Sequence, residues 1–145
     1  MTRGGSQVAE HVREQRPQGL LDTCVVIDLV DIPSDRLPVE AAVPSVVLAE
    51  LTQGVAMATD PVETLTRAQR VADIEARFST VPFDREAARR YGTMVALTLK
   101  ANRNPRPRRM DLMIAATAAA HGLPLYTRNP DDFKGLESGL EVISV

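Results

Sequence analysis

The chain has 145 residues, a formal net charge of −2, 44% hydrophobic residues and one cysteine. This length suits a single domain with one core. A lone cysteine excludes an internal disulfide and a cysteine-rich zinc site. No apolar run approaches the roughly 18 residues of a membrane span, so we expect a soluble cytoplasmic protein without membrane contact. The near-neutral charge leaves any nucleic-acid binding to a local basic patch.

The N-terminal part of the chain divides into a polar leader and a buried acid. Residues 1–18 are polar and predict a flexible leader before one folded domain at 19–145. The apolar segment 20–27 predicts a strand buried on both faces that runs into a turn or a short helix. Asp22 lies within this segment. Because burial of an unpaired carboxylate is costly, Asp22 needs either a cage of hydrogen bonds or a cation.

Short apolar segments alternate with longer amphipathic segments along the rest of the chain. Ser45, Asp60 and Asp84 precede three of the amphipathic segments and predict helix caps. This alternation predicts an α/β fold with a central parallel sheet flanked by helices. In chain order we predict a loop at 28–38, a strand at 39–43, helices at 46–57 and 61–78, a short strand or connector at 80–83, a helix at 85–100, a basic loop at 100–109, a helix at 110–122, and strands at 123–127 and 140–145.

Two further acids occupy unusual positions in the predicted helices. Glu50 shares a helix face with Val47 and Leu51, although a side chain that tilts to solvent or pairs with an arginine would also explain this pattern. Asp111 stands at the start of the helix at 110–122, which has almost no polar face. Asp111 is therefore either a plain helix cap, favoured by the helix dipole, or a third acid that enters the core.

Residues 100–109 contain five cations and two prolines. This composition predicts an irregular basic loop. The loop is either a solvated linker or an arm that contacts phosphates, because it leads directly to Asp111. The candidate phosphate-contacting side chains in this loop are Arg103, Arg106, Arg108 and Arg109.

The acids follow predicted strands or open helices, so in a parallel sheet they would gather at one edge, together with the polar turn at 128–133. Three carboxylates about 5 Å apart repel one another by roughly 3 kcal/mol per pair at an effective dielectric constant of about 20. A divalent cation reverses that repulsion. Oxygen donors without a cysteine or histidine cluster select a hard ion, Mg²⁺ or Mn²⁺, rather than zinc. The matching chemistry is phosphodiester hydrolysis.

Other mechanisms are poorly supported by the sequence. His11 and His121 are badly placed for a serine or cysteine hydrolase, and there is no glycine-rich phosphate-binding loop. An aspartyl phosphatase usually has a second acid two positions after the first, where this chain has Cys24. Cys24 is expected to be an inert packing residue. His121 is expected to bond to carbonyls at the end of its helix.

The candidate acids lie within four short motifs. These are Leu21-Asp22-Thr23, then Pro44-Ser45 with Ala49-Glu50-Leu51, then Asp111 with Ile114-Ala115-Ala116-Thr117-Ala118, and finally Thr127-Arg128-Asn129 with Asp132-Phe133. In order and spacing they resemble the motifs of PIN-domain ribonucleases, and most of all those of the VapC toxins of bacterial toxin–antitoxin pairs. The resemblance covers about residues 19–145.

This resemblance implies a PIN-like three-layer α/β/α fold and a Mg²⁺- or Mn²⁺-dependent endoribonuclease. It also implies a homodimer and a cognate VapB-type antitoxin that occludes the site. By position, the catalytic and metal-binding acids are Asp22, Glu50 and Asp111, and either Asn129 or Asp132 is the fourth ligand. Ser45 and Thr127 match the hydroxyl side chains that support these ligands.

We therefore hypothesise a metal-dependent endoribonuclease that acts as the toxin of such a pair. Asp22 and Asp111 would be the principal metal ligands, and Glu50 or a metal-bound water would accept the proton. The basic loop would steer the RNA backbone. The alternative is a catalytically weak PIN-like binding module that acts mainly in a regulatory complex with its antitoxin on DNA. The asparagine at position 129 is the feature that favours this alternative.

Overall fold

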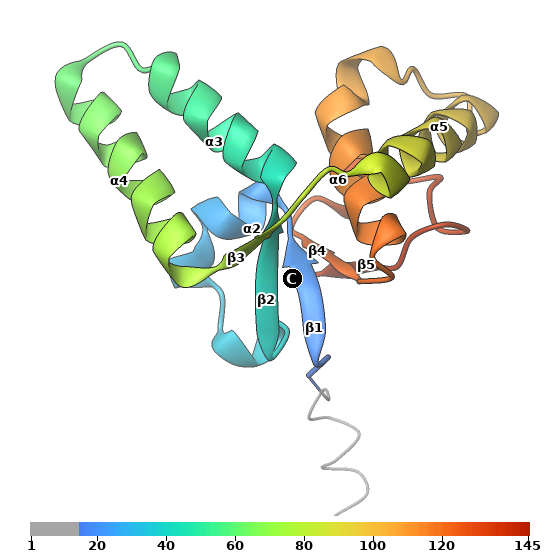
Figure 1. Ribbon diagram of the computed structural model, residues 1–145, viewed down its shortest axis with the longest axis horizontal. Coiled ribbons are helices and arrows are strands. Elements are labelled where there is room, and N and C mark those ends of the chain that lie inside the picture. The colour runs from blue at the N-terminus through green and yellow to red at the C-terminus, as the bar shows by residue number, and fades with distance from the viewer. Residues whose placement is uncertain (1–14) are drawn as a thin grey trace, which may run out of the picture.

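A five-stranded sheet forms the centre of the computed structural model, which describes residues 15–145. The strands are β1 (Gln18–Leu21), β2 (Glu40–Pro44), β3 (Ser79–Val81), β4 (Leu125–Thr127) and β5 (Val142–Ser144). Their order in the sheet is β3–β2–β1–β4–β5, and every neighbouring pair is parallel. The predicted α/β fold with a central parallel sheet and flanking helices is confirmed (Figure 1).

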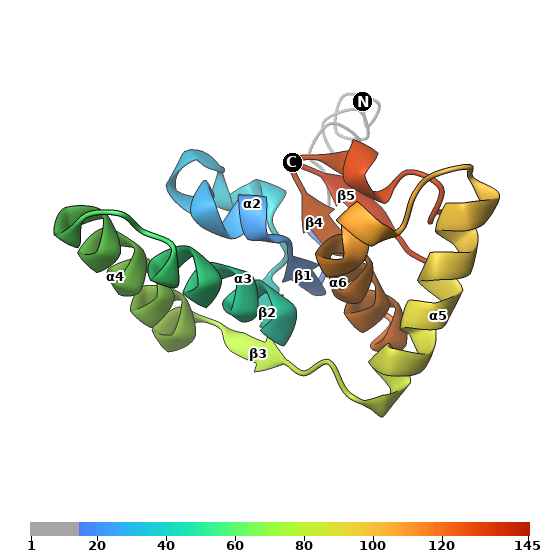
Figure 2. The ribbon, with the colours of Figure 1, turned by 90° about the horizontal axis from the view of Figure 1, so that it is seen from above.

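The longer helices form two pairs beside this sheet. The helices are α2 (Thr23–Ile27), α3 (Ser45–Ala56), α4 (Pro61–Arg77), α5 (Arg85–Lys100) and α6 (Arg109–Ala120), with 3-10 turns η1 (Leu29–Asp31), η2 (Ser34–Arg36), η3 (Arg106–Arg108) and η4 (Pro130–Phe133). α3 packs on α4, and α5 packs on α6. Figures 1 and 2 show the two pairs diverging on either side of the carboxyl ends of β1 and β2. Side chains at these strand ends therefore lie between the two helix pairs.

Two of the three predicted helix caps are confirmed. The carboxylate of Asp60 accepts a hydrogen bond from the Glu63 backbone N–H at 2.8 Å, and Asp84 accepts one from Ala87 at 2.9 Å. The predicted cap at Ser45 is wrong, because α3 begins at Ser45 itself, directly after Pro44. The Ser45 hydroxyl instead accepts a hydrogen bond at 3.1 Å from the backbone of Phe83, and so links α3 to the segment after β3.

Two predicted boundaries also need correction. The strand predicted at 20–27 ends at Leu21, because Asp22 caps α2 and turns the chain into a helix. Apolar periodicity cannot separate a short buried strand from a short buried helix, and the capping acid decides between them. The basic loop is only partly irregular, since residues 106–108 form a 3-10 turn and α6 begins at Arg109.

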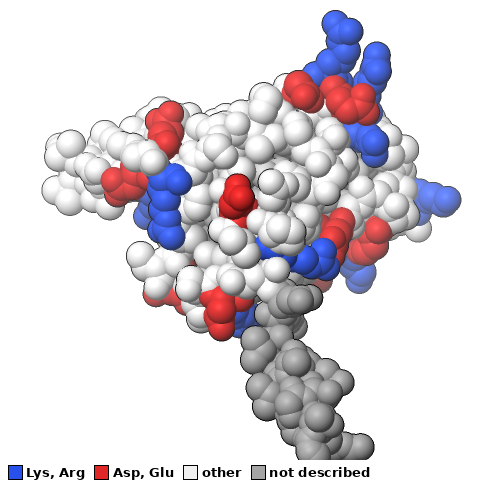
Figure 3. Space-filling model, turned by 60° about the horizontal axis from the view of Figure 1, so that its bottom comes forward, with Lys and Arg blue, Asp and Glu red and all other residues white. Residues whose placement is uncertain are grey.

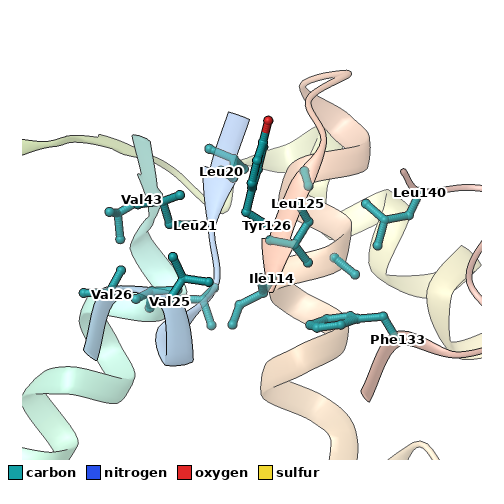
Figure 4. Packing of buried hydrophobic residues seen from close by; sticks show 14 of the residues in the cluster. Leu20, Leu21, Val25, Val26, Val43, Ile114, Leu125, Tyr126, Phe133 and Leu140 are labelled. Carbon is teal, nitrogen blue, oxygen red and sulfur yellow. The ribbon is translucent and has the colours of Figure 1, made fainter. Parts of the chain in front are cut away.

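The core is continuous across both halves of the molecule. One buried cluster contains Leu20 and Leu21 of β1, Val25 of α2, Ile114 of α6 and Leu125 of β4 (Figure 4). α6 is buried almost all round, as its sequence predicts. The remaining labelled residues of the cluster in Figure 4 are Val26, Val43, Tyr126, Phe133 and Leu140.

The predicted leader at 1–18 lies mostly outside the described residues. In its described part, the Gln15 side chain donates hydrogen bonds to the carbonyls of Ser34 and Leu37 at 2.9 and 3.0 Å, and Arg16 pairs with Glu141. Among residues 15–145, no helix combines the length and the apolar character that a membrane span requires. On the face toward the lower end of Figure 1, cations and acids are scattered rather than gathered by sign (Figure 3).

Candidate active site

Asp22 lies at the carboxyl end of the central strand, inside a cage of hydrogen bonds. Its side chain is 4% exposed. Leu21 pairs with Tyr126 across β1 and β4, so the next residue of each strand, Asp22 and Thr127, are neighbours. The Thr127 hydroxyl donates to Asp22 Oδ2 at 2.8 Å, the Thr23 backbone N–H donates to Oδ1 at 2.8 Å, and Cys24 Sγ lies 3.4 Å from Oδ2. Burial raises the pKa of Asp22, and these hydrogen bonds offset only part of that rise.

Glu50 on α3 is joined to Asp22 through the residue between β1 and α2. The Thr23 hydroxyl donates to Glu50 Oε1 at 2.6 Å, while the Thr23 backbone holds Asp22. Burial raises the pKa of Glu50, the Thr23 hydrogen bond lowers it, and the charge of Asp22 raises it again. Glu50 is half-buried and forms no ion pair with any described arginine, so the arginine-paired interpretation is not supported. The sequence analysis did not select Thr23, although its position beside Asp22 was the available signal.

Asp111 lies in the first turn of α6 and faces the same group of acids. Burial raises the pKa of Asp111 to about 7, together with the negative charges of Asp22, Asp132 and Glu50, while the cation of Arg108 acts in the opposite direction. The carboxylate does not cap the helix, because Arg108 holds the cap position and no side-chain cap bond forms there. The plain-cap interpretation of Asp111 is therefore wrong.

The two candidates for a fourth ligand differ in their surroundings. The charge of Asp132 raises the pKa of both Asp22 and Asp111, so its carboxylate faces the same space. Asn129 is exposed, and its backbone N–H donates to the Thr127 hydroxyl at 3.0 Å. The electrostatics therefore favour Asp132 as the fourth acid, whereas Asn129 contributes its backbone.

The donor set suits a hard cation, but not one enclosed by three carboxylates. Within residues 15–145, no three His, Cys, Asp or Glu side chains lie close enough to share one ion, so the three-carboxylate cage considered from the sequence is absent. Mg²⁺ typically binds through one or two carboxylates and keeps several waters. The all-oxygen composition and the upward pKa shifts of Asp22, Glu50 and Asp111 fit a site of that kind, because a cation would relieve their mutual repulsion.

The structure also tests the predicted roles of Ser45, Cys24 and His121, and only that of Ser45 changes. Ser45 is engaged with the backbone of Phe83, which leaves Thr127 as the hydroxyl that holds Asp22. Cys24 packs against the core as predicted, and burial raises the pKa of its thiol; its sulfur also lies 3.4 Å from Asp22 Oδ2 and accepts the backbone N–H of Arg128 at 3.3 Å. The predicted bond of His121 to a carbonyl at the end of its helix is confirmed, because Nδ1 donates to the Thr117 carbonyl at 2.9 Å.

The four arginines of the basic loop do not share one environment. Arg103 donates to the carbonyls of Asp131 and Lys134 at 2.9 and 3.0 Å, and thus fastens the loop to η4. Arg106 and Arg109 are exposed, and Arg109 Nε donates to the Arg106 carbonyl at 3.1 Å. Arg108 is half-buried beside Asp111. Of the four arginines, only Arg108 has a charge that affects the pKa of Asp111.

Comparison with known proteins gives one family match and close relatives. The family model described as PIN domain matches residues 19–137. Ribonuclease VapC5 of Mycobacterium tuberculosis (strain ATCC 25618 / H37Rv) is 37% identical over 134 residues, which cover 88% of this chain and 95% of that protein.

Solved structures show the same fold. The toxin–antitoxin complex VapBC-5 from Mycobacterium tuberculosis contains a chain with a TM-score of 0.77 and 33% identity, covering 89% of this chain and 99% of that one. FitAcB from Neisseria gonorrhoeae has a TM-score of 0.64 at 26% identity, covering 86% and 96%. VapBC2 from Rickettsia felis, bound to a DNA fragment from its promoter, has a TM-score of 0.72 at 20% identity, covering 88% and 98%, and shows the fold alone.

Proposed function

The chain belongs to the PIN-domain family and is a homologue of the VapC ribonucleases of toxin–antitoxin systems, and from that premise we propose that it is an endoribonuclease toxin that requires Mg²⁺ or Mn²⁺. One observation carries the proposal. Asp111 has its pKa raised to about 7 by burial and by the charges of three other acids, which come from distant parts of the sequence. A bound cation would stabilise the charged form of such a group of acids.

In this proposal Asp22 and Asp111 would hold the ion, and Glu50 and Asp132 would complete the group of acids around it. The bound ion would lower the pKa of a water and neutralise charge on the phosphate. Glu50, aligned by Thr23, accepts the proton of the attacking water. The water oxygen forms a bond to phosphorus, the bond from phosphorus to one ribose oxygen breaks, and that leaving oxygen takes up a proton.

The test compares the wild type with Asp22→Asn, which keeps the size of the side chain and removes its charge. With Mg²⁺ or Mn²⁺ present, the wild type should cleave a pool of structured RNAs, and the variant should be slower by more than about 100-fold. Loss of groups that merely support metal ligands already costs 10- to 100-fold. Expression of the wild type should also arrest bacterial growth, and expression of the variant should not. Equal cleavage by both proteins would contradict the proposal.

The alternative is a weak nuclease that acts in a regulatory complex on DNA. The asparagine at position 129 favours it, but the place of Asp132 among the acids restores a fourth carboxylate and weighs against it. Failure of the wild type to cleave RNA at any metal concentration, with intact binding of an antitoxin–DNA complex, would select this alternative.

A VapB-type antitoxin is the proposed partner, and an apolar groove is its proposed docking surface. This groove, between α2–η1 and α4, has a cavity volume of about 740 Å³. Val30 at its edge is 94% exposed and Leu65 is 70% exposed. We expect an amphipathic antitoxin segment to cover these side chains. We also propose that the toxin is a homodimer and that its nuclease domain spans residues 19–145. It would act in the cytoplasm, on cellular RNA. The aliphatic residues that line the groove are Val26, Ile27, Leu29, Val30, Leu65 and Ile74.

A further inference from the structure

The first arginine of the basic loop is placed by the way in which α5 ends. Asn102 adopts a left-handed backbone conformation, with a φ of 59°. Its backbone N–H donates to the Leu99 carbonyl at 3.0 Å, and the backbone N–H of Arg103 donates to the Thr98 carbonyl, also at 3.0 Å. These two bonds form a Schellman motif, a common end of helices in which asparagine can take the left-handed position. Because neither bond uses the side chain of Arg103, a substitution there leaves the helix end intact.

From this helix end the Arg103 side chain reaches the turn that follows β4. Its Nη1 atom donates to the Asp131 carbonyl at 2.9 Å and to the Lys134 carbonyl at 3.0 Å, on either side of Asp132 in the sequence. Arg103 forms no ion pair with any carboxylate in residues 15–145. Both hydrogens of that nitrogen are therefore engaged by the backbone of the turn 131–134.

Close packing holds the same turn against the end of α5 and the core. Gly135 has a φ of 96°, and a Cβ at this position would lie 2.8 Å from the Cβ of Ala101. Phe133 is 1% exposed, and η4 packs on α6 and β5. The two bonds from Arg103 therefore belong to a packed contact between the end of α5 and the turn.

A chain of hydrogen bonds joins this turn to the buried Asp22. The Thr127 hydroxyl donates to Asp22 Oδ2 at 2.8 Å and accepts the backbone N–H of Asn129 at 3.0 Å. The Asn129 carbonyl in turn accepts the backbone N–H of Asp132 at 3.0 Å. Asp132 is half-buried. Its position relative to Asp22 is thus set by this chain of bonds on one side and by Arg103 on the other.

We propose that Arg103 is a positioning residue, which fixes the turn 131–134 so that the Asp132 carboxylate stays with the other acids of the site. The inference deepens the proposed ribonuclease function and rests on it. Loss of the contact would let Asp132 move away from Asp22, and metal binding at the site would weaken. This role differs from the phosphate contact predicted for Arg103 from the sequence, because its bonds are to the protein backbone.

A double-mutant cycle on RNA cleavage tests whether Arg103 acts through Asp132. Arg103→Met removes every donor, and it should lower kcat by about 10-fold, as loss of a group that supports a metal ligand does. In an Asp132→Asn background the same change should alter kcat by less than about 2-fold, because the carboxylate that it positions is already absent. Equal losses in the two backgrounds would overturn the proposal. Arg89→Met, at an exposed arginine of α5, is the matched control and should leave kcat within about 2-fold of wild type.

RNA affinity separates positioning from direct contact with phosphate. It is measured in the Asp22→Asn background, where cleavage is slow. Arg103→Met should leave the salt dependence of the affinity unchanged, whereas Arg106→Met, at an exposed arginine of the same loop, should lower the slope by about 1. A slope lowered by about 1 in Arg103→Met would show a phosphate contact and overturn the proposal.

Amide hydrogen exchange separates this inference from the proposed function, since it needs neither RNA nor metal. In the metal-free protein, the Asp132 amide should exchange at least about 10-fold faster in Arg103→Met than in wild type, because loss of two hydrogen bonds makes local opening of the turn easier. Arg89→Met should leave that rate unchanged. Exchange at Asp132 that is as slow in Arg103→Met as in wild type would overturn the proposal. Faster exchange in a protein that fails to cleave RNA would support the contact and reject the nuclease.

Discussion

The buried acids of this site are stabilised to very different degrees. Asp22 accepts bonds from a backbone N–H, a hydroxyl and a thiol, and these donors offset part of the cost of burying its charge. Asp111 receives no hydrogen bond from any described residue. Its acidic neighbours raise its pKa, and the charge of Arg108 lowers it. Asp111 is therefore the acid whose charged form most needs a cation. Its protonation state should link stability to pH and to metal.

Asp111→Asn tests this linkage. The pKa of Asp111 is about 7 in the folded protein, above the value near 3.9 of an unfolded chain. Between these pH values the folded state keeps a proton that the unfolded state has lost, so metal-free wild type loses stability as pH rises from about 4 to about 7. The loss should be about 1–2 kcal/mol after allowance for solvent screening of a half-buried group.

By thermal melting in a chelator at pH 8, Asp111→Asn should therefore have a Tm about 2–6 °C above that of the wild type, and the two should converge near pH 4. Mg²⁺ should raise the Tm of the wild type more than that of the variant. A Tm of the variant clearly below that of the wild type at pH 8 would mean that Asp111 has a structural role.

At the scale of the elements, close packing between strands holds the site acids in register. Asp22 directly follows β1 and Thr127 ends β4, and their alignment depends on how closely the two strands approach. Gly19 of β1 lies directly against the ring of Tyr126: a Cβ at this position would be 2.5 Å from Tyr126 Cε1 and 3.2 Å from Pro38 Cγ. Because Tyr126 is itself buried, its ring has little room to move.

Gly19→Ala should therefore destabilise the protein by about 1–3 kcal/mol through overpacking, and lower the Tm accordingly. Gly92→Ala is the matched control. Gly92 lies within α5, and a Cβ there would meet nothing within 4 Å. That change should raise stability by about 0.5–1 kcal/mol, because alanine has the higher helix propensity. Chemical denaturation gives the free energy of unfolding of both variants. Equal values would show that β1 and β4 can move apart at little cost.

At the scale of the whole molecule, exposed aliphatic side chains and the acidic site belong to different surfaces. The proposed docking groove is built from α2, η1 and α4, whereas the acids come from the end of β1 and from α3, α6 and η4. Binding of the antitoxin and catalysis can therefore be altered separately. Apolar anchors buried at the centre of an interface usually carry most of its binding energy.

Leu65→Asp should weaken binding of a cognate VapB-type antitoxin by at least about 10-fold, because it replaces an apolar contact with a charge that binding would bury. Cleavage of RNA by the free variant should stay at the wild-type rate. Val39→Asp, at a valine that is 65% exposed outside the groove, is the control and should bind like wild type. Titration calorimetry gives both affinities, and equal weakening by the two changes would place the antitoxin elsewhere.

The sequence by itself determined the type and order of the elements, because these depend on local chemistry. The nearly continuous apolar residues of α6 predicted a buried helix. The positions of Asp60 and Asp84 before amphipathic segments predicted the helix caps that both residues form. The unusual positions of Asp22, Glu50 and Asp111 could also be recognised, since an acid in an apolar segment stands out without any knowledge of the fold.

Only the tertiary structure decided which side chains satisfy one another. Ser45 looked like a cap, yet its hydroxyl accepts a bond from a residue 38 positions away. Thr23 joins two acids that are far apart in sequence, and the Nε of Arg108 is left without a partner. These outcomes depend on distances between segments that meet only after the sheet has formed. Local sequence sets what each side chain can bond to, and packing of remote elements sets what it meets.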